Sequence, residues 1–168
     1  VQTGFARTGK WFGFEHSGVV PDVVTLAKSM GNGMPVGACW AKREIASVFK
    51  PGDHGSTYSG TAIATAAVRA VIDEMRHMDA PAVAARQGGR LRAGLAAIPA
   101  VKEVRGQGLL LAADLGPGAD AKAAYEALLA AGLVTNAVNA TALRLAPPIT
   151  VSDAEIDEAL AIMKRVLA

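Results

Sequence analysis

The spacing of apolar residues changes along the chain, and the change separates two kinds of structure. Before residue 60, short runs rich in β-branched residues stand between glycines; residues 23–27 (VVTLA) predict a buried strand and residues 36–41 a second one. From Thr61 onward the apolar positions recur every three to four residues, which is typical of helices that bury one face. We therefore expect loops and strands first, followed by a helix-rich region.

The chain after residue 80 predicts a compact α+β unit. A helix is expected at about 81–97, an Ala-rich helix is closed by Gly132, and Ser152 and Glu155 form a capping box at the start of the last helix. Four strands are expected at 101–105, 109–115, 133–138 and 142–145. On this pattern residues 1–78 are part of a larger layered sheet domain, and residues 79–168 are a small C-terminal domain.

Composition narrows the class of protein. Hydrophobic residues make up 51% of the chain and charged residues 19%, which is enough to build a core, and the net charge is only +2 without a basic stripe. We therefore expect no nucleic-acid partner. The single cysteine, Cys39, excludes an internal disulfide, indicates a reducing cytoplasm and is expected within a buried strand. No apolar run approaches the ~20 residues that cross a bilayer, and no signal peptide is visible, so no membrane is expected.

Lys28 is the first candidate for chemistry. It ends the apolar strand 23–27, at the position where open α/β sheets place their ligands. A buried strand leaves little room for a long charged side chain, whereas an aldehyde cofactor would hold its nitrogen as an imine. The alternative is an ordinary solvated lysine after a strand.

Two further segments carry groups that bind anions. Residues 54–60 (HGSTYSG) place hydroxyls and backbone N–H groups just before a predicted helix, which suits a phosphate dianion; ordinary helix capping is the alternative. Alternation in residues 143–148 (LRLAPP) places Arg144 on the face opposite its leucine neighbours, where a guanidinium could grip a carboxylate or simply face water. The three histidines lack the spacing of a metal cluster, so no metal is expected.

These segments, taken together, resemble the class III (ornithine-type) aminotransferases of fold type I, and within them the acetylornithine aminotransferases. The resemblance covers essentially the whole chain, and five motifs stand in the family's order. They are VQTGFARTG (1–9), PDVVTLAK (21–28), GNGMPVGA (31–38), HGST (54–57) and LRLAPP (143–148). The implied fold is α/β: the C-terminal portion of a fold type I transferase dependent on pyridoxal 5′-phosphate (PLP).

The resemblance also implies a role for each matching residue. Lys28 would form the Schiff base with PLP and shuttle the proton, Gln2 would hydrogen-bond the cofactor's phenolic oxygen, and Val1 would pack against its ring. Thr57 would bind the cofactor phosphate, in the neighbouring subunit of a homodimer. Ser56 would lie close to the amino donor, and Arg144 would bind a substrate carboxylate.

The implied reaction belongs to arginine biosynthesis: N-acetylornithine and 2-oxoglutarate give N-acetylglutamate semialdehyde and glutamate. Relatives acting on ornithine, succinylornithine or 4-aminobutyrate remain alternatives, as does a non-catalytic fragment. The family carries an Asp-Glu pair immediately before the position of Val1, and that Asp pairs with the cofactor's ring nitrogen. We therefore expect this chain to be only part of the enzyme and to have little activity alone.

Overall fold

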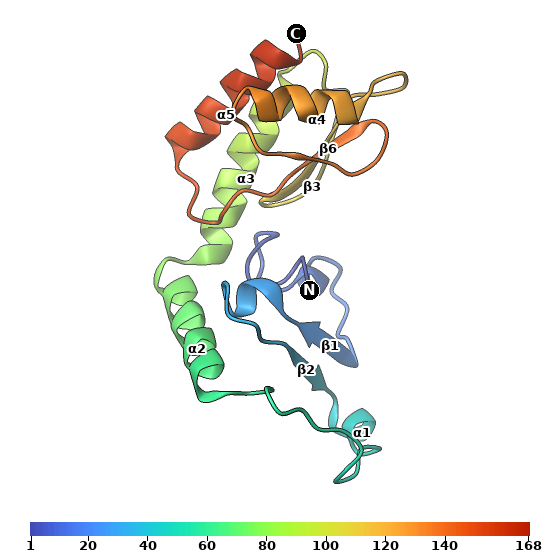
Figure 1. Cartoon of the computed structure of the whole chain (residues 1–168), viewed down its shortest axis with the longest axis vertical. Coiled ribbons are helices and arrows are strands. Elements are labelled where there is room, and N and C mark those ends of the chain that lie inside the picture. The colour runs from blue at the N-terminus through green and yellow to red at the C-terminus, as the bar shows by residue number, and fades with distance from the viewer. The chain divides into compact units, whose positions relative to one another are not determined.

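The computed structural model describes all 168 residues, which form two compact units (Figure 1). The N-terminal unit consists of Val1–Ala6 and Lys10–Ala80. The C-terminal unit consists of Pro81–Ala168 together with the short segment Arg7–Gly9. The chain therefore passes between the units three times, which sequence patterns did not indicate.

The N-terminal unit is built around a two-stranded antiparallel sheet. β1 (Val23–Leu26) pairs with β2 (Ala38–Ala41), and the turn between them includes the 3-10 helix η2 (Lys28–Met30), which contacts α2. The remaining elements of the unit are η1 (Gly13–His16), α1 (Arg43–Ala46) and α2 (Ala62–His77).

Two expectations for this sheet are wrong. β1 is not buried, since its residues alternate between exposed and half-buried positions and Val23 is 46% exposed. Cys39 lies in β2 as expected, but it is exposed as well. The reason is the same for both: an apolar strand is buried only when other layers cover its two faces, and a two-stranded ribbon in this chain has no such cover.

The C-terminal unit is a four-stranded antiparallel sheet with helices packed on one face (Figure 1). The strand order is β3-β4-β6-β5, so β6, the last strand along the chain, lies between two strands that precede it in sequence. The strands are β3 (Glu103–Gln107), β4 (Leu110–Asp114), β5 (Asn136–Ala137) and β6 (Ala142–Leu145). The helices are α3 (Ala80–Ala96), α4 (Ala121–Ala130) and α5 (Asp153–Val166).

One hydrophobic core joins this sheet to its helices. Leu111 on β4 and Leu143 and Leu145 on β6 turn toward the helices, which contribute Leu95 and Ile156 among others, all of them nearly or fully buried. Period-2 alternation leaves polar and charged residues on the opposite face of the sheet. The helices and β6 lie close to their expected bounds, whereas the expected strand 133–138 is reduced to two residues.

The N-terminus of the last helix, α5, is capped as the sequence predicted. The Ser152 hydroxyl accepts a hydrogen bond from the Glu155 backbone N–H, and the Glu155 carboxylate accepts one from the Ser152 backbone N–H, at 2.7 Å. The bond from the Ser152 N–H lowers the pKa of Glu155. None of the helices combines the length and the apolar character that crossing a membrane requires.

A glycine in α3 lets the helix touch the turn between β3 and β4. A Cβ on Gly88 would lie 2.2 Å from the carbonyl oxygen of Gly108, whereas a Cβ on the next residue, Gly89, would meet nothing within 4 Å. A clash between a Cβ on Gly88 and backbone atoms could not be relieved by a rotamer change. The helix therefore requires glycine at position 88, where it contacts the turn.

This pair of glycines provides a matched test of the packing. Gly88→Ala should lower the free energy of unfolding by about 1–3 kcal/mol, because the new methyl forces α3 and the turn apart. Gly89→Ala should raise it by up to about 1 kcal/mol, because alanine favours the helix and clashes with nothing. Urea denaturation of both variants measures the difference. Equal effects of the two substitutions would contradict the close approach of α3 to the turn.

Candidate functional site

Lys28 occupies a strained position at the end of β1. It is the first residue of η2 and has φ = 55°, in the left-handed region that a residue with a Cβ rarely adopts. Such a conformation costs roughly 1–2 kcal/mol and persists only where the surrounding structure holds it. In the turn that follows, a Cβ on Gly31 would lie 2.4 Å from the Met34 carbonyl oxygen, so this position admits only glycine.

The Lys28 side chain is exposed and makes no hydrogen bond or ion pair within this chain. It lines an open hollow of about 340 Å³ formed by the turn that follows β1. The other residues of the hollow are Ser29, Asn32, Gly33, Met34, Pro35 and Val36. An amine without an internal partner, on a backbone held in strain, is available to bind an external group.

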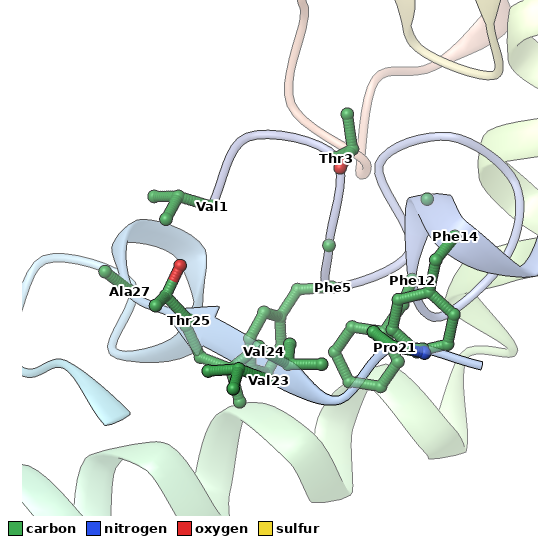
Figure 2. Close-up of a pocket in the computed structure, with 13 residues that line it drawn as sticks. Val1, Thr3, Phe5, Phe12, Phe14, Pro21, Val23, Val24, Thr25 and Ala27 are labelled. Carbon is green, nitrogen blue, oxygen red and sulfur yellow. The ribbon is translucent and has the colours of Figure 1, made fainter. Parts of the chain in front are cut away.

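A second cavity, of about 250 Å³, lies between β1 and residues 1–14. Figure 2 shows Val1 beside Thr25 and Ala27 at one end of this cavity, and the rings of Phe5, Phe12 and Phe14 toward the other. Val1 is 48% exposed. The structure therefore brings the predicted ring-packing residue to the strand end that carries Lys28.

The other predicted cofactor residues are less enclosed. Gln2 is exposed, and its amide has no hydrogen-bond partner in this chain. Ser56 and Thr57 are exposed and line none of the three cavities described for this structure. The helix begins where the sequence predicted, with α2 starting at Ala62, and its cap residue Thr61 makes no side-chain capping bond. These hydroxyls are therefore not engaged in helix capping and are accessible to a ligand.

Arg144 lies on β6 in the C-terminal unit. The burial pattern of the strand confirms the predicted alternation, with Leu143 and Leu145 buried and Arg144 half-exposed on the opposite face. Its guanidinium makes no hydrogen bond or ion pair within the chain. Arg144 thus offers an uncompensated positive charge and a forked set of donors, which suits a carboxylate.

Arg144 also lines a cavity of about 480 Å³ at the β5 edge of the sheet. The walls come from the segment before β5, from the residues after β6 and from α5, and they include Val134, Asn136, Ala146 and Pro148. Thr135 belongs to the same wall, and its Oγ1 is buried without a hydrogen-bond partner. The cavity therefore combines apolar walls with several polar groups that have no internal partner.

Arg7 was not singled out from the sequence, although it lies within one of the motifs. In the C-terminal unit its guanidinium donates hydrogen bonds to the carbonyl oxygens of Leu109 and Pro147, and the Leu109 N–H donates to the Arg7 carbonyl at 3.0 Å. Burial lowers the pKa of this guanidinium. Arg7 thereby fixes the segment after β6 that walls the cavity of Arg144. The sequence feature that could have identified Arg7 is its position as a basic residue within a loop of small and aromatic residues.

No group of three or more histidine, cysteine, aspartate or glutamate side chains in the structure is arranged to hold a metal ion. The groups available for chemistry are therefore the amine of Lys28, the hydroxyls of residues 56–57 and the guanidinium of Arg144. Lys28 and Arg144 belong to different units.

Comparison with known proteins identifies relatives over the whole chain. The family profile described as Aminotransferase class-III matches residues 1–167. The chain is 45% identical over 175 residues to the acetylornithine aminotransferase of Caldanaerobacter subterraneus subsp. tengcongensis and 41% identical over 172 residues to that of Bacillus subtilis. These matches cover 100% of this chain but 43% and 44% of the relatives. The chain thus spans less than half the length of these relatives.

Solved structures show the same relationship. The acetylornithine aminotransferase from Elizabethkingia anophelis superposes with a TM-score of 0.90 and 32% identity, covering 99% of this chain and 46% of its own. The ornithine aminotransferase from Toxoplasma gondii ME49 gives a TM-score of 0.90 and 29% identity, covering 99% and 41%. The α/β fold is therefore that of a portion of a fold type I PLP-dependent aminotransferase.

The anchoring role of Arg7 can be tested in this chain. Arg7→Ala should lower the free energy of unfolding of the C-terminal unit by about 1–3 kcal/mol, because it removes a charged donor from two carbonyl groups. Arg86→Ala is the matched control, since Arg86 is exposed and makes no side-chain bond, and should change stability by less than about 0.5 kcal/mol. Urea denaturation compares the two. A loss no larger for Arg7 than for Arg86 would show that the bonds to Leu109 and Pro147 do not anchor the segment.

Proposed function

This chain belongs to the class III aminotransferases, and we propose that it supplies the catalytic lysine and a substrate-binding arginine to an acetylornithine aminotransferase. The observation that carries the proposal is Lys28, a partnerless amine on a strained backbone at the end of β1. The proposed reaction transfers the terminal amino group of N-acetylornithine to 2-oxoglutarate, as part of arginine biosynthesis. Its support is that the two curated relatives described above bear that name.

The cofactor of the class III aminotransferases is pyridoxal 5′-phosphate. This chain has residues that fit parts of such a group. The amine of Lys28 suits its aldehyde, the half-exposed side chain of Val1 suits one face of its ring, and the unpaired amide of Gln2 suits the phenolic oxygen. The exposed hydroxyl of Thr57 suits the phosphate, which we assign to the neighbouring subunit of a homodimer.

Each residue then has a defined task in the proposed reaction. When bound, the cofactor supplies an electron sink for the charge left at the amino-bearing carbon of the donor. Lys28 holds the cofactor between turnovers, and its Nζ moves the proton that leaves that carbon. Val1 keeps water from the ring face.

Arg144 has the complementary task of recognising the substrate. Its guanidinium can bind a carboxylate through two parallel hydrogen bonds, and glutamate's α-carboxylate is the group we assign to it. We place Ser56 close to the amino donor. In this assignment residues 1–78 belong to the large PLP-binding domain and residues 79–168 to the small domain.

The assembly we propose is a cytoplasmic homodimer with active sites at the subunit interface. Large apolar side chains that need cover are concentrated in the N-terminal unit. The most exposed in that unit are Val20 (72%), Val48 (69%), Phe49 (60%), Tyr58 (85%) and Ile63 (69%). Both the rest of the large domain and a second subunit could bury them, since large exposed apolar side chains favour such contacts. Cys39, exposed and unpaired, suits a reducing compartment.

A related donor specificity is the second candidate. The solved relatives include ornithine aminotransferases, which have the same fold over 99% of this chain. Steady-state rates with N-acetylornithine, ornithine, succinylornithine and 4-aminobutyrate would separate these donors. A preference for any of the last three would replace the proposed substrate and leave the assigned chemistry in place.

Because we assign only some of the active-site groups to this chain, we predict that the chain alone is inactive. Transamination of N-acetylornithine by the 168-residue protein with PLP should not exceed the background rate, because the groups that complete the site lie elsewhere. A chimera should be active when this chain replaces the matching 172-residue segment of the Bacillus subtilis enzyme. Coupled measurement of glutamate formation tests both proteins. Enzyme-like turnover by the isolated chain would contradict this account.

The role of Lys28 can be tested in the same chimera. Lys28→Ala should lower kcat by roughly 10²–10⁴-fold, because the proton transfer loses its base. It should also abolish the cofactor band that borohydride reduction fixes to the protein. Lys50→Ala is the matched control, since Lys50 is exposed and its ammonium has no partner; it should leave both properties unchanged. Retention of borohydride-fixed cofactor by the Lys28 variant would refute the assignment.

A further inference from the structure

The open face of the C-terminal sheet carries a row of four side chains in register. Arg105 on β3 lies opposite Ala112 on β4, Ala112 lies opposite Arg144 on β6, and Arg144 lies opposite Asn136 on β5. Residues directly opposite each other in antiparallel strands project to the same face with Cβ atoms about 4.5–5.5 Å apart. Arg144 therefore has a methyl group on one side and an amide on the other.

The two arginines of this row differ in their electrostatic state. Arg105 is paired with Glu103 at 3.6 Å and with Asp114 at 3.0 Å. Asp114 is further committed to the Gly116 N–H, which, with a Thr141 bond and the charge of Arg105, lowers its pKa. Arg144 has no counter-ion at all within the chain. The acidic groups on this face, Glu103 and Asp114, are thus occupied by Arg105. Glu155 also lines the cavity of Arg144, but its carboxylate is bonded to Ser152, and the charge of Arg144 is left for an external anion.

Asn136 has the properties of a second ligand for that anion. Its side chain is exposed and makes no hydrogen bond within the chain, and it lines the same cavity as Arg144. A carboxylate can accept about four hydrogen bonds, and the two from a guanidinium fork leave acceptor sites open. An amide N–H can fill one of these sites without adding a charge. An acidic side chain at this position would instead cancel the charge of Arg144.

We propose that Asn136 is a specificity-determining residue that donates a hydrogen bond to the substrate carboxylate bound by Arg144. The inference rests on the carboxylate role assigned to Arg144 under the proposed function. The cavity shared by the two residues, about 480 Å³ in volume, has room for a short dicarboxylate. The pairing of β5 with β6 fixes the backbone of Asn136 opposite that of Arg144 before the ligand arrives, so binding does not have to order the two strands.

The test is an NMR titration of the full 168-residue chain with glutarate, read from the Asn136 side-chain amide and the Arg144 Nε–H resonances. Glutarate should move both resonances, and neutral glutaramide should move neither. Asn136→Ala should weaken binding by roughly 3–10-fold, the effect of one solvent-exposed hydrogen bond. Asn136→Asp should weaken it at least as much as Arg144→Ala, because the new carboxylate pairs with Arg144. Val138→Ala, an apolar change on the same strand edge, should leave the affinity unchanged.

The outcomes distinguish this inference from the function on which it rests. If Arg144→Ala abolishes binding and Asn136→Ala does not weaken it, Asn136 has no recognition role and Arg144 keeps its own. If Arg144→Ala leaves binding unchanged, or glutarate does not bind, both assignments are overturned. In the active chimera, Asn136→Ala should raise KM for 2-oxoglutarate by a similar factor with kcat unchanged. A fall in kcat with unchanged KM would contradict a role in carboxylate recognition.

Discussion

The position of β6 between β4 and β5 is the constraint on which the C-terminal unit depends. Leu143 and Leu145 enter the core from this strand, and each contributes roughly 1.5–3 kcal/mol by leaving water. A slip of one residue in the register would expose both leucines and turn Arg144 into the core, where an unpaired charge is far more costly. The burial of two leucines therefore fixes the direction of the arginine between them. The guanidinium of Arg144 therefore lies on the open face because its two leucine neighbours pack into the core.

The N-terminal unit has a different balance between stability and exposure. Its buried apolar residues are few, and only Phe5, Met30 and Met75 among them are large, whereas many of its other large apolar side chains face outward. The strained backbone of Lys28 adds a local cost in a unit with little core to offset it. Within the proposed enzyme, the missing part of the large domain and a second subunit would supply the compensating burial. On this proposal, the unit that carries Lys28 is stabilised in part by contacts beyond this chain.

The sequence predicted the local features of the fold better than the pairing of its strands. Capping by Ser152 and Glu155, the alternation around Arg144 and the helical periods could be read because each depends on residues close together in the chain. The expected burial of β1 failed because burial depends on which layers cover a strand, and four apolar residues cannot reveal that. The bonds of Arg7 to Leu109 and Pro147 join residues more than 100 positions apart, beyond the reach of any local pattern.

The residues of the candidate site likewise fall into those that the sequence predicted and those that it did not. Lys28 and Arg144 could be identified from the sequence because Lys28 directly follows an apolar strand and Arg144 lies within one, where a charged side chain is uncommon. Asn136 could not, since asparagine is common near turns and only the register of β5 with β6 places it beside Arg144. Its strand has two residues, so alternation alone was too short to assign a face. A residue that contributes to ligand recognition because it lies beside a charged residue on a neighbouring strand is therefore not identifiable from one sequence alone. Strand register is the information that reveals them.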